Sequence, residues 1–178
     1  MNMRKIDDEI QALLSEHRGD IRSILKDNHR LDLLYALSSQ RELLLEWYDF
    51  EPEAEVLQVG ADYGALTGLL RSSVSAVTVL DDTESALETV RQRYPGAANI
   101  HYHKDSLTGY AAEACAEGKK YDYVIFAGTL TAPYEDHIHA AKALLKPEGI
   151  LIVASANALG MKYFAGTVEE ENALTKRQ

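Results

Sequence analysis

The feature that most constrains this chain is a change of pattern at Ala54, where helical periodicity gives way to short apolar runs separated by helical segments. The runs are VLQVG, AVTVLD, NIHYH, YDYVIFAG and GILIVAS. The helical segments lie at about 65–72, 85–94, 110–117 and 135–145, and Pro147 and Gly149 are expected to turn the chain into the last strand. Because strands that alternate with helices pair in parallel, the pattern predicts a doubly wound α/β domain with a mostly parallel sheet.

Residues 1–50 show helical periodicity only, which predicts an N-terminal helical cap. Apolar residues share a face over 6–14 and 21–25, and form a wide stripe from about Leu31 to Trp47. Trp47 and Tyr48 are expected in the core rather than in a ligand cage. The α/β domain is expected to span 51–166, and residues 167–178 read as a polar tail with too little apolar content for another core strand.

Composition narrows the class of partner. The 18 Lys and Arg stand against 28 Asp and Glu, a net charge of −10, which disfavours a broad nucleic-acid footprint. No apolar run reaches the ~20 residues of a membrane helix, so no membrane contact is expected. The single cysteine, Cys115, and the absence of a signal-peptide pattern at the start indicate a cytoplasmic protein.

The first strand runs into a turn with two glycines, whose residues are Gly60, Ala61, Asp62, Tyr63 and Gly64. Such a turn crosses the carboxyl edge of the sheet, where doubly wound folds bind ligands, and the helix that follows offers free amides to an anionic group. Glycine allows a ligand to approach the backbone or permits a positive φ. A ligand-binding loop and a plain tight turn are both compatible with this spacing.

Acidic residues end the next two strands. Asp81 and Asp82 lie about twenty residues beyond the turn, where a carboxylate can accept hydrogen bonds from a ribose diol. Asp81 is the favoured ligand, because Asp82 can equally cap the next helix. The third strand ends at Asp105 and Ser106, near the expected position of an adenine, although a turn-forming Asp is an equal alternative.

The glycine spacing disfavours a dinucleotide site, and so an NAD-dependent oxidoreductase, and it excludes a phosphate-binding P-loop. A dinucleotide fingerprint requires glycine at 62 and 65, where this chain has Asp62 and Ala65. A phosphate-binding P-loop requires Lys followed by Ser or Thr after the second glycine, and no such pair follows Gly64.

The first strand with its turn, the acid after strand two, and the segments KDS, YDYVIFAGTL and LLKPEGILIV together resemble class I S-adenosylmethionine-dependent methyltransferases. SSQRELLLEWYDFEPEAEVLQVGADYGALTGLL and NALGMKYFAG further resemble a methyltransferase domain of bacterial glycan-biosynthesis proteins. The resemblance implies that S-adenosylmethionine is the cofactor. It also implies that Gly60 and Gly64 contact the methionine part of the cofactor, Asp81 the ribose, Asp105 with Ser106 the adenine, and that Gly128 and Leu130 line the pocket.

Departures from the family pattern bear on the cofactor. The family usually has an acid where this chain has Gln58 and a glycine where it has Asp62, whose carboxylate is expected to repel that of the cofactor. Thr131 and Ala156 stand where the narrower family tends to carry acids. Only 23 residues follow Ser155, so the usual C-terminal strand hairpin is expected to be missing. The open sheet edge is then expected to bind a partner domain or a second copy of the chain.

These considerations predict a methyltransferase domain with an unknown small-molecule acceptor, which the resemblance suggests is a glycan or glycan precursor. It is expected to be either a trimmed part of a longer protein or a domain that has lost its catalytic completion. A non-catalytic domain that serves protein association is the alternative. The candidate cofactor-binding residues are Gln58, Gly60, Ala61, Asp62, Gly64, Asp81, Asp82, Asp105, Ser106 and Gly128. No catalytic residue is assigned, although Tyr134 or His137 could act as a base, and the pairs His101/His103 and His137/His139 are not expected to bind metal.

Overall fold

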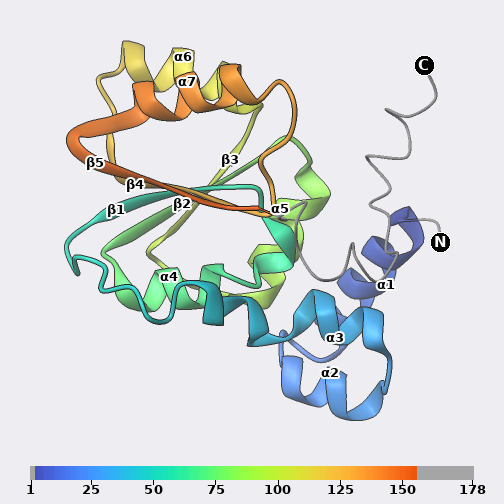
Figure 1. Ribbon diagram of the computed structural model, residues 1–178. Coiled ribbons are helices and arrows are strands. Elements are labelled where there is room, and N and C mark those ends of the chain that lie inside the picture. Colours follow the sequence, from blue (N-terminus) through green and yellow to red (C-terminus); the bar gives the residue numbers. More distant parts are fainter. Residues whose placement is uncertain (1–2, 156–178) are drawn as a thin grey trace, which may run out of the picture.

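A computed structural model describes residues 3–155, and these form a five-stranded sheet covered by helices on both faces (Figure 1). The strands are β1 (Glu55–Val59), β2 (Ala76–Asp81), β3 (Ile100–Lys104), β4 (Tyr121–Ala127) and β5 (Leu145–Ala154). Their order is β3-β2-β1-β4-β5, and every pair is parallel. The predicted doubly wound fold is confirmed, and the order reverses between β1 and β4, where such sheets open a crevice for ligands.

Helices α4 (Thr67–Ser73) and α5 (Glu84–Arg93) lie on one face of the sheet, and α6 (Leu107–Ala116) and α7 (Tyr134–Leu144) lie on the other (Figure 1). All four were predicted, with boundaries shifted by up to three residues. The expected turn at Pro147 and Gly149 is an irregularity inside β5, where the register with β4 jumps from Tyr121↔Leu145 to Tyr123↔Ile150. The last helix therefore ends before Pro147, at Leu144.

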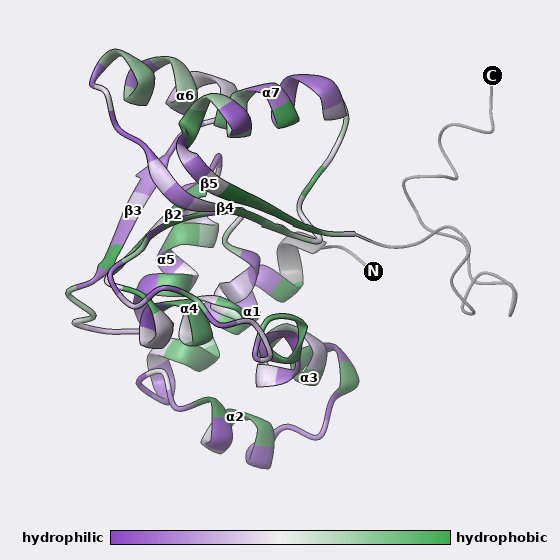
Figure 2. Cartoon of the chain, turned by 60° about the vertical axis from the view of Figure 1, so that its left-hand side comes forward, coloured by the Kyte–Doolittle hydropathy of each residue, from purple (hydrophilic) through white to green (hydrophobic). Residues whose placement is uncertain are grey.

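The strands supply two separate layers of core because consecutive side chains point to opposite faces. Val56, Val77 and Ile125 are buried with Leu70 and Val90 beneath α4 and α5. The residues between them in the strands are buried beneath α6 and α7; they are Leu57, Leu80, Val124 and Phe126. Figure 2 shows β3 as a hydrophilic edge strand, whereas β4 and most of β5 are apolar.

The cap begins with α1 (Met3–Glu16), α2 (Ile21–Asp27) and α3 (Leu31–Leu37), followed by the 3₁₀ helix η1 (Ser39–Leu44). Its core is its own cluster, which includes Ile10, Leu14, Ile24, Leu33 and Leu37. The single apolar stripe expected from Leu31 to Trp47 is wrong, because extended backbone at Ser38 ends α3 and turns the chain away.

Trp47 is 75% exposed, so its expected place in the core is also wrong. Its indole donates to the Leu44 carbonyl at 2.8 Å and its ring lies edge-on to Tyr48. The core position is taken instead by Phe50, which packs with Tyr48 against Tyr123.

Some predictions concern residues outside the described range. The missing hairpin, Ala156, the NALGMKYFAG segment and the 167–178 tail all lie there, and the domain limits 1–50 and 51–166 stay predictions. Within residues 3–155, no helix combines the length and apolar character needed to cross a bilayer.

Candidate cofactor site

The turn after β1 runs from Gly60 to Gly64 and includes the 3₁₀ helix η2 (Asp62–Gly64). Four residues of this five-residue turn have positive φ. Gly60 (φ +91°) and Gly64 (φ +70°) adopt this conformation without strain, whereas Asp62 (φ +42°) and Tyr63 (φ +53°) do so at a cost. A Cβ on Gly60 would also overlap the side chain of Thr129, whose hydroxyl donates to the Val59 carbonyl. The positive φ and the contact with Thr129 therefore explain why residue 60 is glycine without any ligand. The alternative that this segment is a plain tight turn thus has a physical basis.

Gln58 lies beneath this turn and is 3% exposed. Its Nε2 donates to the Gly60 carbonyl at 2.9 Å, and its Oε1 accepts from the Thr67 hydroxyl at 2.8 Å. The side chain thus ties the turn to α4 from inside the protein. A direct role of Gln58 at a cofactor stays a prediction.

A cavity of about 350 Å³ opens at the carboxyl ends of β1, β2 and β3. Its lining brings together five of the predicted residues: Gly60, Asp81, Asp82, Asp105 and Ser106. The rest of the lining is mainly apolar and consists of Val59, Leu80, Leu107, Phe126, Thr129 and His137. Carboxylates beside an apolar wall suit a nucleoside, whose ribose offers hydroxyl donors and whose base offers an apolar face.

Asp81 connects the turn to the start of α5. One carboxylate oxygen accepts from the backbone N–H of Ala61 at 2.9 Å, and the other accepts from the N–H and the hydroxyl of Thr83 at 2.9 and 2.8 Å. A carboxylate has about four lone-pair positions, so the acceptor capacity for ribose hydroxyls is not exhausted. Thr83, not Asp82, is the N-cap residue of α5, and Asp82 is an exposed residue of the cavity wall.

Ser106 is the N-cap residue of α6, and its hydroxyl accepts from the Gly109 N–H at 3.1 Å. Asp105 accepts from the Ser106 N–H at 2.7 Å, as expected of a turn-forming Asp. Both residues nevertheless line the cavity, so the turn role and the binding role are compatible.

Gly128 lies apart from these residues, in a second cavity of about 340 Å³ over the carboxyl ends of β4 and β5. This cavity is also lined by Arg41 and Leu44 from η1 and by Ser155. Arg41 forms an ion pair with Asp62. The pair places a guanidinium between the glycine turn and the end of β4, a group that the sequence analysis missed because η1 was expected to continue a helix.

The ion pair changes the interpretation of Asp62. Burial raises the pKa of Asp62, and Arg41 and Arg93 oppose this rise by favouring the carboxylate. The positive charges of Arg41 and Arg93 therefore offset the negative charge of Asp62. An anionic group of the cofactor would meet these two cations as well as the Asp62 carboxylate.

Arg93 is the second residue that the sequence analysis missed. It is only 8% exposed, and it donates to the Tyr63 carbonyl and to the Leu37 carbonyl, each at 3.0 Å. Tyr63 in turn donates its hydroxyl to Asp7 of α1 at 2.6 Å. The strained turn is thus held from both sides by the cap and α5. Nothing in the sequence predicted these contacts, because an arginine near the end of an amphipathic helix is normally exposed to solvent.

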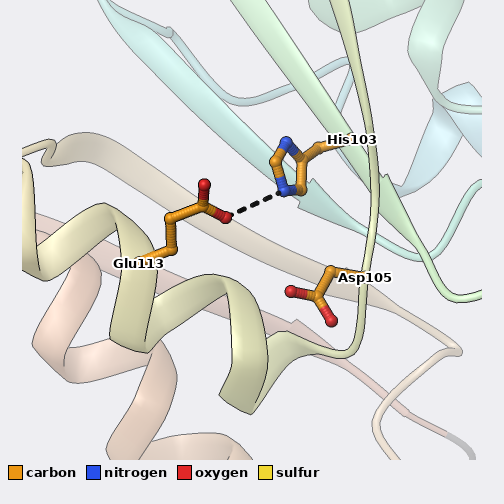
Figure 3. Close-up of side chains that lie close together, drawn as sticks. All are labelled: His103, Asp105 and Glu113. Carbon is orange, nitrogen blue, oxygen red and sulfur yellow. Dashed lines mark ion pairs between the residues drawn. The ribbon is translucent and has the colours of Figure 1, made fainter.

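The histidines occupy separate places. His137 lines the nucleoside-sized cavity, with its Nδ1 2.9 Å from the Thr131 carbonyl, whereas Tyr134 is an exposed residue outside that cavity's lining. Among the described residues, one group of three potential metal ligands is present, formed by His103, Asp105 and Glu113 (Figure 3). Of the histidines weighed from the sequence, the group contains His103 but not its neighbour His101, nor the pair His137/His139.

Comparison with solved structures agrees with the topology. The N-methyltransferase NodS from Bradyrhizobium japonicum superposes with a TM-score of 0.57 at 19% identity over 76% of this chain and 77% of that chain. A phosphoethanolamine N-methyltransferase from Haemonchus contortus gives a TM-score of 0.57 at 18% identity, covering 87% of this chain and 33% of that chain. This chain has the fold of the S-adenosylmethionine-dependent methyltransferases.

The same fold extends to a protein described as a precorrin 8W decarboxylase from Methanobacterium thermoautotrophicum, with a TM-score of 0.55 at 21% identity over 70% of this chain. This chain spans 66% of the length of that protein. It spans smaller shares of other matched structures, such as 47% of the CcbJ methyltransferase from Streptomyces caelestis. No family model and no curated protein matches the sequence.

Proposed function

We propose that this chain binds S-adenosylmethionine and transfers its methyl group to a small-molecule acceptor. The observation that carries the proposal is the convergence of Asp81, Asp105 and Ser106, from two separate strand ends, on one cavity beside the Gly60 turn. In this cavity Asp81 would accept from the ribose hydroxyls, Asp105 and Ser106 would face the adenine, and Leu80, Leu107 and Phe126 would exclude water around it.

The chemistry that the cofactor supplies is displacement at its sulfonium methyl by a nucleophile of the acceptor. Rate acceleration in such a reaction comes mainly from alignment and from exclusion of water. In this chain, Asp81 and the Gly60 turn position the cofactor, and the cap helices cover the turn.

We propose a glycan or glycan precursor as the acceptor and a cytoplasmic location. Cys115 as the single cysteine supports the location, and sequence resemblance supports the acceptor class.

The direct test is calorimetric titration of the chain with S-adenosylmethionine and with its demethylated product, S-adenosylhomocysteine. Saturable one-to-one binding of both is expected. Titration with 5′-methylthioadenosine, which keeps the nucleoside and lacks the amino-acid part, measures the contribution of the 350 Å³ cavity separately. Absence of binding for all three ligands would refute the proposed function.

Arg41 is predicted to hold the carboxylate of the cofactor. A guanidinium can pair with two carboxylates, and Arg41 lies between Asp62 and the cavity that contains Gly128. Replacement of Arg41 by Gln is expected to lower the affinity for S-adenosylhomocysteine about 10-fold, or ~1.4 kcal/mol, and to leave the affinity for 5′-methylthioadenosine unchanged. Equal weakening of both ligands would mean that Arg41 acts only through the fold of the turn.

A second candidate function, protein association, is favoured by the β5 edge. Within the described residues β5 pairs only with β4, and Ile150 and Val153 are about 40% exposed on this apolar strand. Apolar edge strands are prone to pair with another chain. We propose that a second copy, or a partner domain, pairs there.

Light scattering over a range of concentrations tests the edge. The chain is expected to self-associate, and Val153→Lys is expected to reduce the association because a charge on an edge strand opposes pairing. Leu43→Lys, at a residue that is 64% exposed in the cap, is the matched control. A monomer at all concentrations, or dissociation by Leu43→Lys alone, would contradict an interface at β5.

A further inference from the structure

Three side chains with metal-ligand chemistry meet where β3 ends beside α6. Two of them, His103 and Glu113, lie outside the lining of the 350 Å³ cavity, whereas Asp105 also belongs to that lining. His103 comes from β3, Asp105 follows it, and Glu113 projects from α6 toward them (Figure 3). One donor atom from each lies within 4.8 Å of the other two, and the His103 Nε2 is 3.6 Å from a Glu113 carboxylate oxygen. The group combines one imidazole with two carboxylates.

The backbone explains why these residues converge. His103 and Asp105 are two residues apart, so they leave the strand on the same side. Gly109 and Glu113 are four apart, so they share one face of α6. A Cβ on Gly109 would lie 2.6 and 2.7 Å from the Asp105 carboxylate oxygens, so the carboxylate occupies space that a side chain at this position would fill.

Two of the three donors are held in place. The His103 ring packs against Tyr110 with centroids 4.4 Å apart, and Asp105 accepts from the Ser106 N–H at 2.7 Å. The Glu113 side chain is 59% exposed and is free to adjust. Donors around a tetrahedral zinc ion are about 3.3 Å apart, as follows from metal–ligand bonds of roughly 2.0–2.1 Å. Small side-chain movements therefore suffice to close the group around an ion.

We infer that His103, Asp105 and Glu113 form a binding site for a divalent transition-metal ion of the Zn²⁺ type. An imidazole with two carboxylates suits Zn²⁺ and its neighbours in the first row better than Mg²⁺ or Ca²⁺, which favour oxygen ligands alone. Three protein ligands leave at least one position for water. The strongly negative chain, with a net charge of −10, adds to the attraction for a cation.

The test is titration of the tag-free, nucleoside-free chain with Zn²⁺ by calorimetry and with Co²⁺ by visible absorption. One equivalent of each metal is expected to bind. His103→Ala and Glu113→Gln are each expected to weaken binding at least 10-fold. Gly109→Ala is expected to weaken it while all three donors remain, because its methyl group displaces the Asp105 carboxylate.

Matched controls lie on or directly beside the same two elements. His101→Ala, two residues earlier on β3, and Glu117→Gln, at the C-cap of α6, are expected to bind metal like the parent chain. Far-ultraviolet circular dichroism of each variant separates loss of a ligand from loss of fold. The inference is overturned if no saturable binding occurs, if folded His103→Ala binds like the parent, or if Co²⁺ produces a thiolate charge-transfer band, which would place the metal on the exposed Cys115.

Discussion

Replacement of Asp81 by alanine is expected to weaken binding of S-adenosylmethionine by about 10- to 100-fold, or roughly 1.5–3 kcal/mol, the range for hydrogen bonds to a charged group. On the proposed binding mode, the variant loses the acceptor for the ribose hydroxyls. It also frees the N–H groups of Ala61 and Thr83, which the carboxylate holds at 2.9 Å. Calorimetric titration of the folded variant measures the change.

Two further variants show how Asp81 acts. Asp82→Ala is the control, because Asp82 lies in the cavity wall but is exposed and is not the cap of α5, and its removal is expected to change affinity little. Asp81→Asn keeps an oxygen that can accept from Thr83, and it should fall between the parent and Asp81→Ala. If Asp81→Ala bound S-adenosylmethionine as tightly as the parent, the ribose assignment would be wrong.

Replacement of Arg93 by methionine is expected to lower the free energy of unfolding by about 3 kcal/mol, because two hydrogen bonds from a buried guanidinium are lost and two carbonyls lose their donors. The carbonyls belong to Tyr63 in the strained turn and to Leu37 in the cap. For a chain of this size the change corresponds to a decrease of roughly 6–12 °C in Tm. Thermal and denaturant unfolding followed by circular dichroism measure it.

Arg91 provides the matched control on the same helix. Its guanidinium pairs with Glu84 and Glu88 at the surface, where ion pairs contribute little, so Arg91→Met is expected to cost less than 1 kcal/mol. Similar losses of unfolding free energy in both variants would mean that the methionine itself destabilises α5. The hydrogen bonds from Arg93 to the Tyr63 and Leu37 carbonyls would then not be the cause.

The sequence by itself determined the order of elements and the edge at which the candidate site lies. Five apolar runs separated by helical segments leave few alternatives to a parallel sheet, and the residues that follow parallel strands meet at one edge. Asp81, Asp105 and Ser106 could therefore be placed together before any contact was known, because strand ends depend only on local pattern and topology.

Only the tertiary structure decided which groups surround that edge. Arg41 and Arg93 reach the turn from η1 and α5, and the metal-ligand group joins His103 to Glu113 across two elements. The expectations for Trp47 and for one apolar stripe from Leu31 to Trp47 were wrong for the same reason. Local periodicity shows which residues could be buried, whereas the packing of the cap against α5 and the turn selects which of them are.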